Sequence, residues 1–163
     1  MIKVNPDEYL SENDLNESLV IKMYHLQEKE EIHLIIDFAR TPQLLRYLET
    51  GVRSSVPYPR DFRHLVFSGT SEISISDVQI KNPEDLLNYY STKDNPSLIL
   101  QFVELQQNGK NRISLFFGTD GTLRFTFDTL EVERKFGCGV KAGDDWDYFE
   151  VESGKKFDFY NPF

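Results

Sequence analysis

Apolar and polar residues alternate along most of the chain, which is typical of half-buried β-strands rather than of helices. The alternation is clearest at 19–26 and 31–39, which we predict to form a hairpin around the turn 27–30. The register is set by bringing the apolar positions onto one face. The predicted pairs are His25 with Ile32, Tyr24 with His33, Met23 with Leu34, Ile21 with Ile36, and Leu19 with Phe38.

Two more hairpins and a long last strand are predicted downstream. Their strands are 62–67 with 72–80, 98–105 with 112–117, and 123–132. Asn108–Gly109 favours a type I′ turn, and a three-residue loop, Thr119–Gly121, precedes the last strand. The apolar phase slips at Ser76–Asp77 and again at Asp128–Thr129, which indicates a β-bulge or a bend between sheets at each place.

Two short helices are expected, at 43–49 and 83–90, because proline opens each of them. Residues 1–17 are polar and aperiodic in their second part, so we predict a loose N-terminal arm with one helical turn. Together the elements predict a single domain, 1–163, that is mainly β. Its architecture is an antiparallel sandwich or a strongly curved sheet of about seven strands with two short helices.

Composition supports a folded core in a reducing compartment. Of the 163 residues, 39% are hydrophobic and 13% aromatic, which is enough to fold without a disulfide. Cys138 is the only cysteine, so no internal disulfide can form. The N-terminus has no apolar signal core, and no stretch reaches the ~18 apolar residues of a membrane span. We therefore expect a cytoplasmic protein that does not bind membranes.

Charge points to the class of partner. The net charge of −9 opposes binding to nucleic acid and steers a basic protein towards the chain. The densest acidic stretch lies in the acidic and aromatic segment 136–163. The predicted partner-binding residues are Asp144, Asp145, Trp146, Asp147 and Tyr148, with Trp146 as the anchor. The alternative is a solvated acidic loop, and the spacing does not match a calcium-binding EF-hand loop.

No catalytic or metal-binding motif accompanies these residues. The three histidines and one cysteine have no zinc-ligand spacing, and the chain lacks the GxSxG, HExxH and phosphate-loop motifs. We therefore predict no catalytic residues, no cofactor and no tightly bound metal. If the protein is instead an enzyme or a small-ligand binder, Arg60, His64 and Asp128 are the candidates for the mouth of a pocket between the sheets.

Two blocks, 60–73 and 121–132, resemble parts of small bacterial domains of unknown function, some of them similar to immunity proteins of toxin systems. The resemblance is one of hydrophobic pattern, and it implies a binding protein rather than an enzyme. The first hypothesis is thus a non-enzymatic binding module, in its most specific form an immunity-type inhibitor of a basic toxin. A homo-oligomer that buries its C-terminal aromatic residues across a two-fold axis is a further alternative. In either case we predict that 157–163 is ordered, as a strand at a sheet edge.

Overall fold

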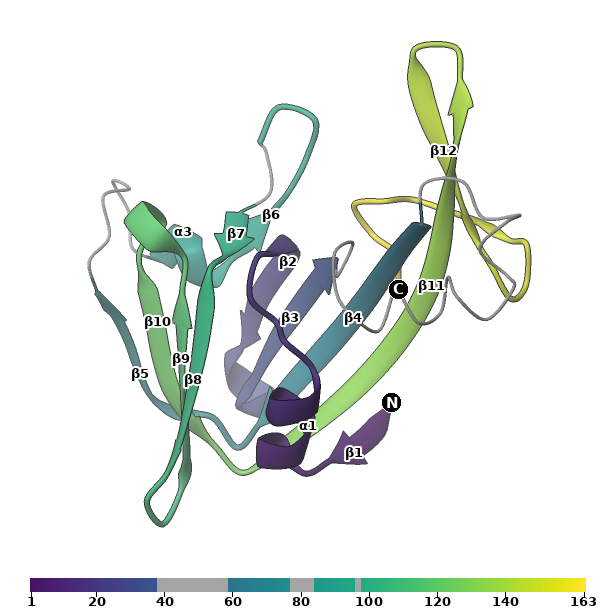
Figure 1. Ribbon diagram of the computed structural model, residues 1–163. Helices are drawn as coiled ribbons and strands as arrows, with labels where there is room; N and C mark the ends of the chain where they lie inside the picture. The colour runs from purple at the N-terminus through teal and green to yellow at the C-terminus, as the bar shows by residue number, and fades with distance from the viewer. Residues whose placement is uncertain (38–58, 77–83, 96–97) are drawn as a thin grey trace.

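The protein is mainly β, with antiparallel strands in two sheets, which confirms the predicted fold class (Figure 1). The described residues include two short α-helices. The computed structural model describes residues 1–37, 59–76, 84–95 and 98–163. The helix predicted at 43–49 and the start of the one predicted at 83–90 lie outside these residues. The described part of the second helix is α3, Glu84–Leu87. Its predicted end is wrong, because Tyr89–Tyr90 form a short strand that pairs with Lys22 and Met23.

The larger sheet curls into a half-barrel. Its strand order is β13 (Lys156–Phe157), β12 (Asp145–Glu150), β11 (Thr129–Ala142), β4 (Pro59–Ser68), β3 (Glu31–Asp37), β2 (Ser18–Leu26) and β6 (Tyr89–Tyr90). Two short strands join it beside this path: β1 (Ile2–Val4) pairs with β11, and β7 (Leu98–Leu100) pairs with β2. The tip of the β11–β12 hairpin projects beyond the rest of the sheet (Figure 1).

The smaller sheet has the order β5 (Ser71–Ser76), β10 (Thr122–Phe127), β9 (Asn111–Phe116) and β8 (Phe102–Gln107). The chain crosses between the sheets at two adjacent places, from β4 to β5 and from β10 to β11. At these crossings the Asp128 amide donates a hydrogen bond to the Ser68 carbonyl over 2.9 Å. The bend predicted at Asp128–Thr129 is therefore confirmed.

The hairpin predicted from 62–67 and 72–80 is wrong. β4 pairs with β3 and β11, whereas β5 pairs with β10. The reason lies in the linking residues. Gly69 has a φ of +67°, and the Thr70 amide donates to the Glu30 carbonyl in the β2–β3 turn rather than closing a hairpin. β4 and β5 are thus consecutive strands of the chain that belong to different sheets and do not pair with each other.

The first hairpin follows the predicted register from Leu26–Glu31 to Met23–Leu34 and then departs from it. Lys22 pairs with Ile35 and Val20 with Ile36, so that Ile21 is an extra residue in a β-bulge. The predicted partners of Ile21 and Leu19 are therefore wrong. The bulge brings Ile21 into a hydrophobic cluster with Ile35 and Phe62.

Two other turns shift the predicted registers. The loop after β8 closes on Gln107 and Asn111, one residue wider than the predicted turn, with Gly109 at a φ of +84°. As a result Phe102 points outward and is 49% exposed. Before β10, Leu123 pairs with Leu115 rather than with Phe117, a shift of two that keeps the same face buried. The strand predicted at 98–105 is split between β7 and β8.

The N-terminal arm is ordered, contrary to the loose arm that we predicted. β1 pairs with β11, and α1 (Pro6–Glu12) follows, with the Asn5 side chain accepting hydrogen bonds from Asp7 and Glu8 amides at its start. Leu15 is buried in the main core at 2% exposure. These contacts were not predicted, because only a few apolar side chains make them and the rest of the arm is polar and aperiodic.

The main core fills the space between the two sheets, and we call that side of the larger sheet its inner face. It is built around Met23, Leu34, Leu65, Phe67, Leu115, Leu123, Phe125 and Leu130, all buried. A second cluster, Ile21, Ile35 and Phe62, lies on the opposite, outer face, where Phe157, Phe159 and Phe163 pack against it. Among the described residues, no helix has the length and apolar character needed to cross a membrane.

Candidate functional site

An open groove of about 900 Å³ lies between the tip of the β11–β12 hairpin and the end of the chain. One wall is formed by Asp144–Tyr148, and the other by Lys156–Tyr160, with Lys93 at the rim. All five residues predicted to bind a partner therefore line one concave surface. Lys93 and the second wall were not predicted to belong to the site. The aromatic residues at 157–160 were the only feature of the sequence that indicated the second wall.

Carboxylates outnumber ammonium groups in the groove. Its lining holds Asp144, Asp145, Asp147 and Asp158 against Lys93 and Lys156, four negative charges to two positive. Asp145 pairs with Lys93 over 2.9 Å and Asp147 with Lys156 over 2.8 Å. Both pairs are largely solvent-exposed, and such pairs contribute little to stability. A cation from another protein can therefore replace either lysine at small cost.

Aromatic rings form the apolar part of the groove. The Tyr148 ring lies 5.0 Å from that of Phe159 and 6.2 Å from that of Phe157, between centroids. The Tyr160 ring meets Phe159 edge-on at 5.3 Å. Trp146 is half-buried beside them. Clustered tyrosine and tryptophan side chains among charges are typical of protein-binding hot spots.

The second wall is part of the docked tail, by which we mean residues 156–163. Phe157 and Phe159 meet the Phe62 ring edge-on at 5.4 and 5.6 Å. Gly137 makes room for this contact, since a Cβ there would lie 2.8 Å from the Phe157 ring. The Lys135 ammonium donates to the Pro162 carbonyl. β13 pairs with β12 at the edge of the sheet, but it includes only Phe157 of the strand predicted at 157–163. The rest of the segment packs on the chain through Phe159 and Phe163.

Deleting residues 157–163 is expected to lower the melting temperature by several degrees. The deletion uncovers Phe62, Ile21 and Ile35, and each apolar Å² exposed costs roughly 25 cal/mol. Scanning calorimetry together with light scattering measures both stability and assembly. An unchanged melting temperature would show that the tail contributes no docking energy, and dissociation of an oligomer would show that it also docks on a second copy.

The three pocket candidates are not brought together. Arg60 and His64 both lie on the outer face of β4, whereas Asp128 lies at the sheet crossing beside Gly69. Arg60 pairs with the buried carboxylate of Asp37 over 3.2 Å. Burial raises the pKa of Asp37 to about 6. Asp128 is thus separated from Arg60 and His64, and none of the three lines the groove.

A chain of polar side chains on the outer face went unpredicted. His33 Nδ1 lies 2.9 Å from His64 Nε2, and His33 Nε2 lies 3.0 Å from a Glu31 carboxylate oxygen. The Tyr24 ring stacks on His33 at 4.5 Å, and its hydroxyl lies 3.1 Å from His33 Nδ1. The pairing of Tyr24 with His33 was predicted, but the contact of His33 with His64 was not. That contact depends on the pairing of β3 with β4, strands that are distant along the chain.

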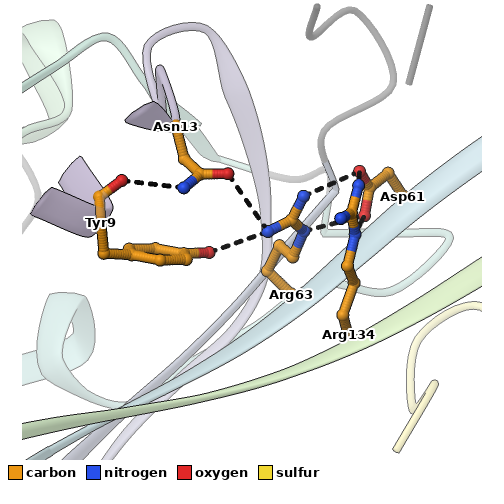
Figure 2. A network of polar contacts seen from close by, with 5 residues as sticks. All are labelled: Tyr9, Asn13, Asp61, Arg63 and Arg134. Carbon is orange, nitrogen blue, oxygen red and sulfur yellow. Dashed lines mark hydrogen bonds and ion pairs between the residues drawn. The ribbon is translucent and has the colours of Figure 1, made fainter. Parts of the chain in front are cut away.

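A buried ionic network on the inner face holds α1 against the larger sheet (Figure 2). The Asp61 carboxylate, fully buried, accepts two hydrogen bonds from Arg63, at 2.9 and 3.1 Å, and two from Arg134, at 3.3 and 3.0 Å. Arg63 also donates to the Tyr9 hydroxyl over 3.0 Å and to Asn13 over 3.4 Å. Burial raises the pKa of Tyr9. These contacts explain the order of the arm and give the network a structural role.

In the parts of the chain that the structure describes, no three His, Cys, Asp or Glu side chains are grouped so that they could hold a metal ion. Cys138 is a free, half-buried thiol on β11. Comparisons of the chain with protein-family models, with curated proteins and with solved structures find no match.

Proposed function

We propose that this protein is a non-enzymatic binding module whose acidic and aromatic groove takes a basic segment of another protein. The observation that carries the proposal is the convergence of Asp144–Tyr148 and the docked tail on one concave surface. The excess of carboxylates selects for arginine or lysine, and the rings of Tyr148 and Tyr160 offer faces on which a guanidinium can stack.

The charge of the whole chain supports the same partner class. A net charge of −9 raises the rate at which a basic protein encounters the surface, and the groove then supplies the short-range contacts. Residues 60–73 and 121–132 resemble parts of small bacterial domains of unknown function, some of them similar to immunity proteins, and this favours a basic toxin as the partner. In that form of the proposal, the groove inhibits the toxin by covering a basic surface.

Two observations make the alternatives weaker. Of the candidates that the enzyme hypothesis named for a pocket mouth, Asp128 lies at the sheet crossing, apart from Arg60 and His64 on the outer face of β4. The aromatic residues that a two-fold interface was to bury, Phe157, Phe159 and Phe163, already pack on the outer face of their own chain. The groove remains as the surface in which charge, aromatic rings and concavity coincide.

A charge-reversal experiment tests the proposal. We expect the double variant Asp145→Lys/Asp147→Lys to bind a tryptophan-free peptide of alternating arginine and glycine at least ten-fold more weakly than the unmodified protein, because two desolvated charge contacts become repulsive. Fluorescence of Trp146, the only tryptophan, reports binding. Titrations at low and high salt separate short-range contacts from long-range attraction.

The matched control is Glu28→Lys/Glu104→Lys, which makes the same change in net charge at exposed positions outside the groove lining. We expect it to change the affinity by less than about three-fold at moderate salt. If both double variants lost the same affinity for the peptide, the groove would contribute only its share of the net charge. An unmodified protein that fails to bind at low salt would contradict the proposed function.

A further inference from the structure

The side chains of β12 that line the groove point to opposite faces of the strand. Successive side chains of a strand alternate between its two faces. Asp145 and Asp147 therefore share one face of β12, the carboxylate face, whereas Trp146 and Tyr148 share the other, the ring face. β11 pairs along this whole stretch on one side. The groove, which all four residues line, thus reaches both faces past the other edge of β12.

A short strand of the same chain already occupies part of this edge. β13 pairs with β12 so that Lys156 lies opposite Phe149 and Phe157 lies opposite Tyr148. The Lys156 ammonium reaches the Asp147 carboxylate over 2.8 Å, on the carboxylate face. The Phe157 ring lies 6.2 Å from that of Tyr148, on the ring face. A basic and an aromatic side chain in succession along one strand therefore match both faces of this edge.

The pairing of β13 ends where the groove opens. The ladder with β12 stops at Tyr148, and the tail then forms a turn in which the Asn161 amide donates to the Asp158 carbonyl over 3.0 Å. The groove continues beside Asp145–Asp147, between the edge of β12 and this turn. It has a carboxylate face and a ring face there, just as the stretch beside β13 has.

Two lysines mark where cations bind on the carboxylate face. Asp147 holds Lys156, and Asp145 holds Lys93, which comes from a distant part of the chain, over 2.9 Å. Side chains two residues apart in an extended segment are separated by about 7 Å, which is also the spacing of the two aspartates along β12. Two basic residues with one residue between them can therefore meet both carboxylates at once.

The residue between the two cations faces the rings. Trp146 is half-buried on the ring face, and the Tyr148 ring lies 5.0 Å from that of Phe159. An apolar side chain placed against these rings is removed from water. A helical partner would need a different sequence, because helical residues that share a face are three or four positions apart.

We propose that the groove takes its basic partner as an extended segment with the pattern basic–apolar–basic, laid along the edge of β12 next to β13. The inference rests on the proposed function and adds to it the conformation and the sequence pattern of the partner. The two cations contact Asp145 and Asp147 in place of the lysines, and the apolar side chain between them contacts Trp146. Addition of an extended segment at a sheet edge is a recurring mode of peptide recognition, in which alternate side chains give specificity.

Two peptides of identical composition test the pattern. Each has four arginines and four valines, which strictly alternate in one peptide and follow one another in pairs in the other. We expect the unmodified protein to bind the alternating peptide at least ten-fold more tightly, because the paired order brings only one arginine to the two carboxylates. Net charge and size are equal, so long-range attraction cancels in the comparison. Fluorescence of Trp146 reports both affinities.

Variants of the protein locate the source of this preference. Asp145→Asn/Asp147→Asn removes both charges from solvent-accessible side chains, and it should reduce the preference for the alternating peptide to less than about three-fold. The matched control, Glu28→Gln/Glu104→Gln, removes two exposed charges outside the groove lining and should keep the full preference.

Transferred nuclear Overhauser effects report the conformation of the bound peptide. We expect strong contacts from each α-proton to the next amide, as in a strand. Contacts between successive amides, as in a helix, would overturn the inference, and so would equal affinity for the two peptides or a preference that survives in Asp145→Asn/Asp147→Asn. Any of these results leaves the proposed function intact. If neither peptide bound at low salt, the proposed function would fail together with the inference.

Discussion

Replacing Phe67 with alanine is expected to lower the free energy of unfolding by about 3–5 kcal/mol. Phe67 is fully buried on β4, and its ring meets Phe125 and Phe127 edge-on at 5.2 and 5.0 Å. Those two rings belong to β10 in the smaller sheet. The side chain therefore joins the two sheets close to the point where the chain crosses between them, and its removal leaves a cavity that neither sheet can fill without moving.

Phe102→Ala is the matched control for this substitution. Phe102 lies on β8 and is 49% exposed, with Phe116 as its ring neighbour at 5.4 Å. The same change of side chain should cost less than about 1 kcal/mol there. Equilibrium denaturation by urea measures both variants. Similar losses for the two would show that the sheets do not pack through Phe67.

Replacing Asp61 with asparagine should also lower the free energy of unfolding by about 3–5 kcal/mol. The substitution keeps the size of the side chain but removes the negative charge between Arg63 and Arg134. Arg63 is 2% exposed, so its buried guanidinium would lose the charge of the carboxylate that accepts two of its hydrogen bonds. We expect α1 to loosen as well, because Arg63 also holds Tyr9 and Asn13 (Figure 2).

The control is Glu72→Gln, which removes a carboxylate from the exposed ion pair with Arg112. Exposed pairs contribute little, so the expected loss is below about 1 kcal/mol. Urea denaturation at pH 7 gives the two losses, and exchange of the α1 amides reports the arm. If Asp61→Asn cost no more than Glu72→Gln, the inner-face network would not be what holds the arm.

Local patterns in the sequence were sufficient to predict most strands. The alternation at 19–26 and 31–37 identified β2 and β3, and the register near their turn is as predicted. The phase slip at Asp128 located the crossing from β10 to β11. These features depend on neighbours along the chain, which the period-two pattern records directly.

The largest failures concern pairings between distant residues, whereas the wrong registers at the turns after β8 and before β10 are local. Nothing in the alternation distinguishes a strand that turns back on itself from one that passes into a second sheet, so β4 and β5 were taken for a hairpin. The bulge at Ile21 depends on the outer-face cluster with Ile35 and Phe62, which comes from other strands. The contact between His33 and His64 was also not predicted, because it too depends on strands that are distant along the chain.

The candidate site was predictable in part. Asp144–Tyr148 stood out by composition, and they share one hairpin with β11, so their clustering is local. The second wall depends on the tail folding back over Phe62 and Gly137. An aromatic end predicts that the tail docks, but not where it docks. The concave shape of the site therefore emerges only from the folded chain.

The central claim is that the groove is where this protein binds a basic partner. The most direct test is a two-dimensional amide and indole NMR titration of the unmodified protein with the peptide of alternating arginine and glycine. The largest shifts are predicted at the Trp146 indole, at the other amides of 144–148 and at those of 156–160, with small shifts across the smaller sheet. Shifts spread evenly over the acidic surface, or centred away from these two segments, would contradict the account.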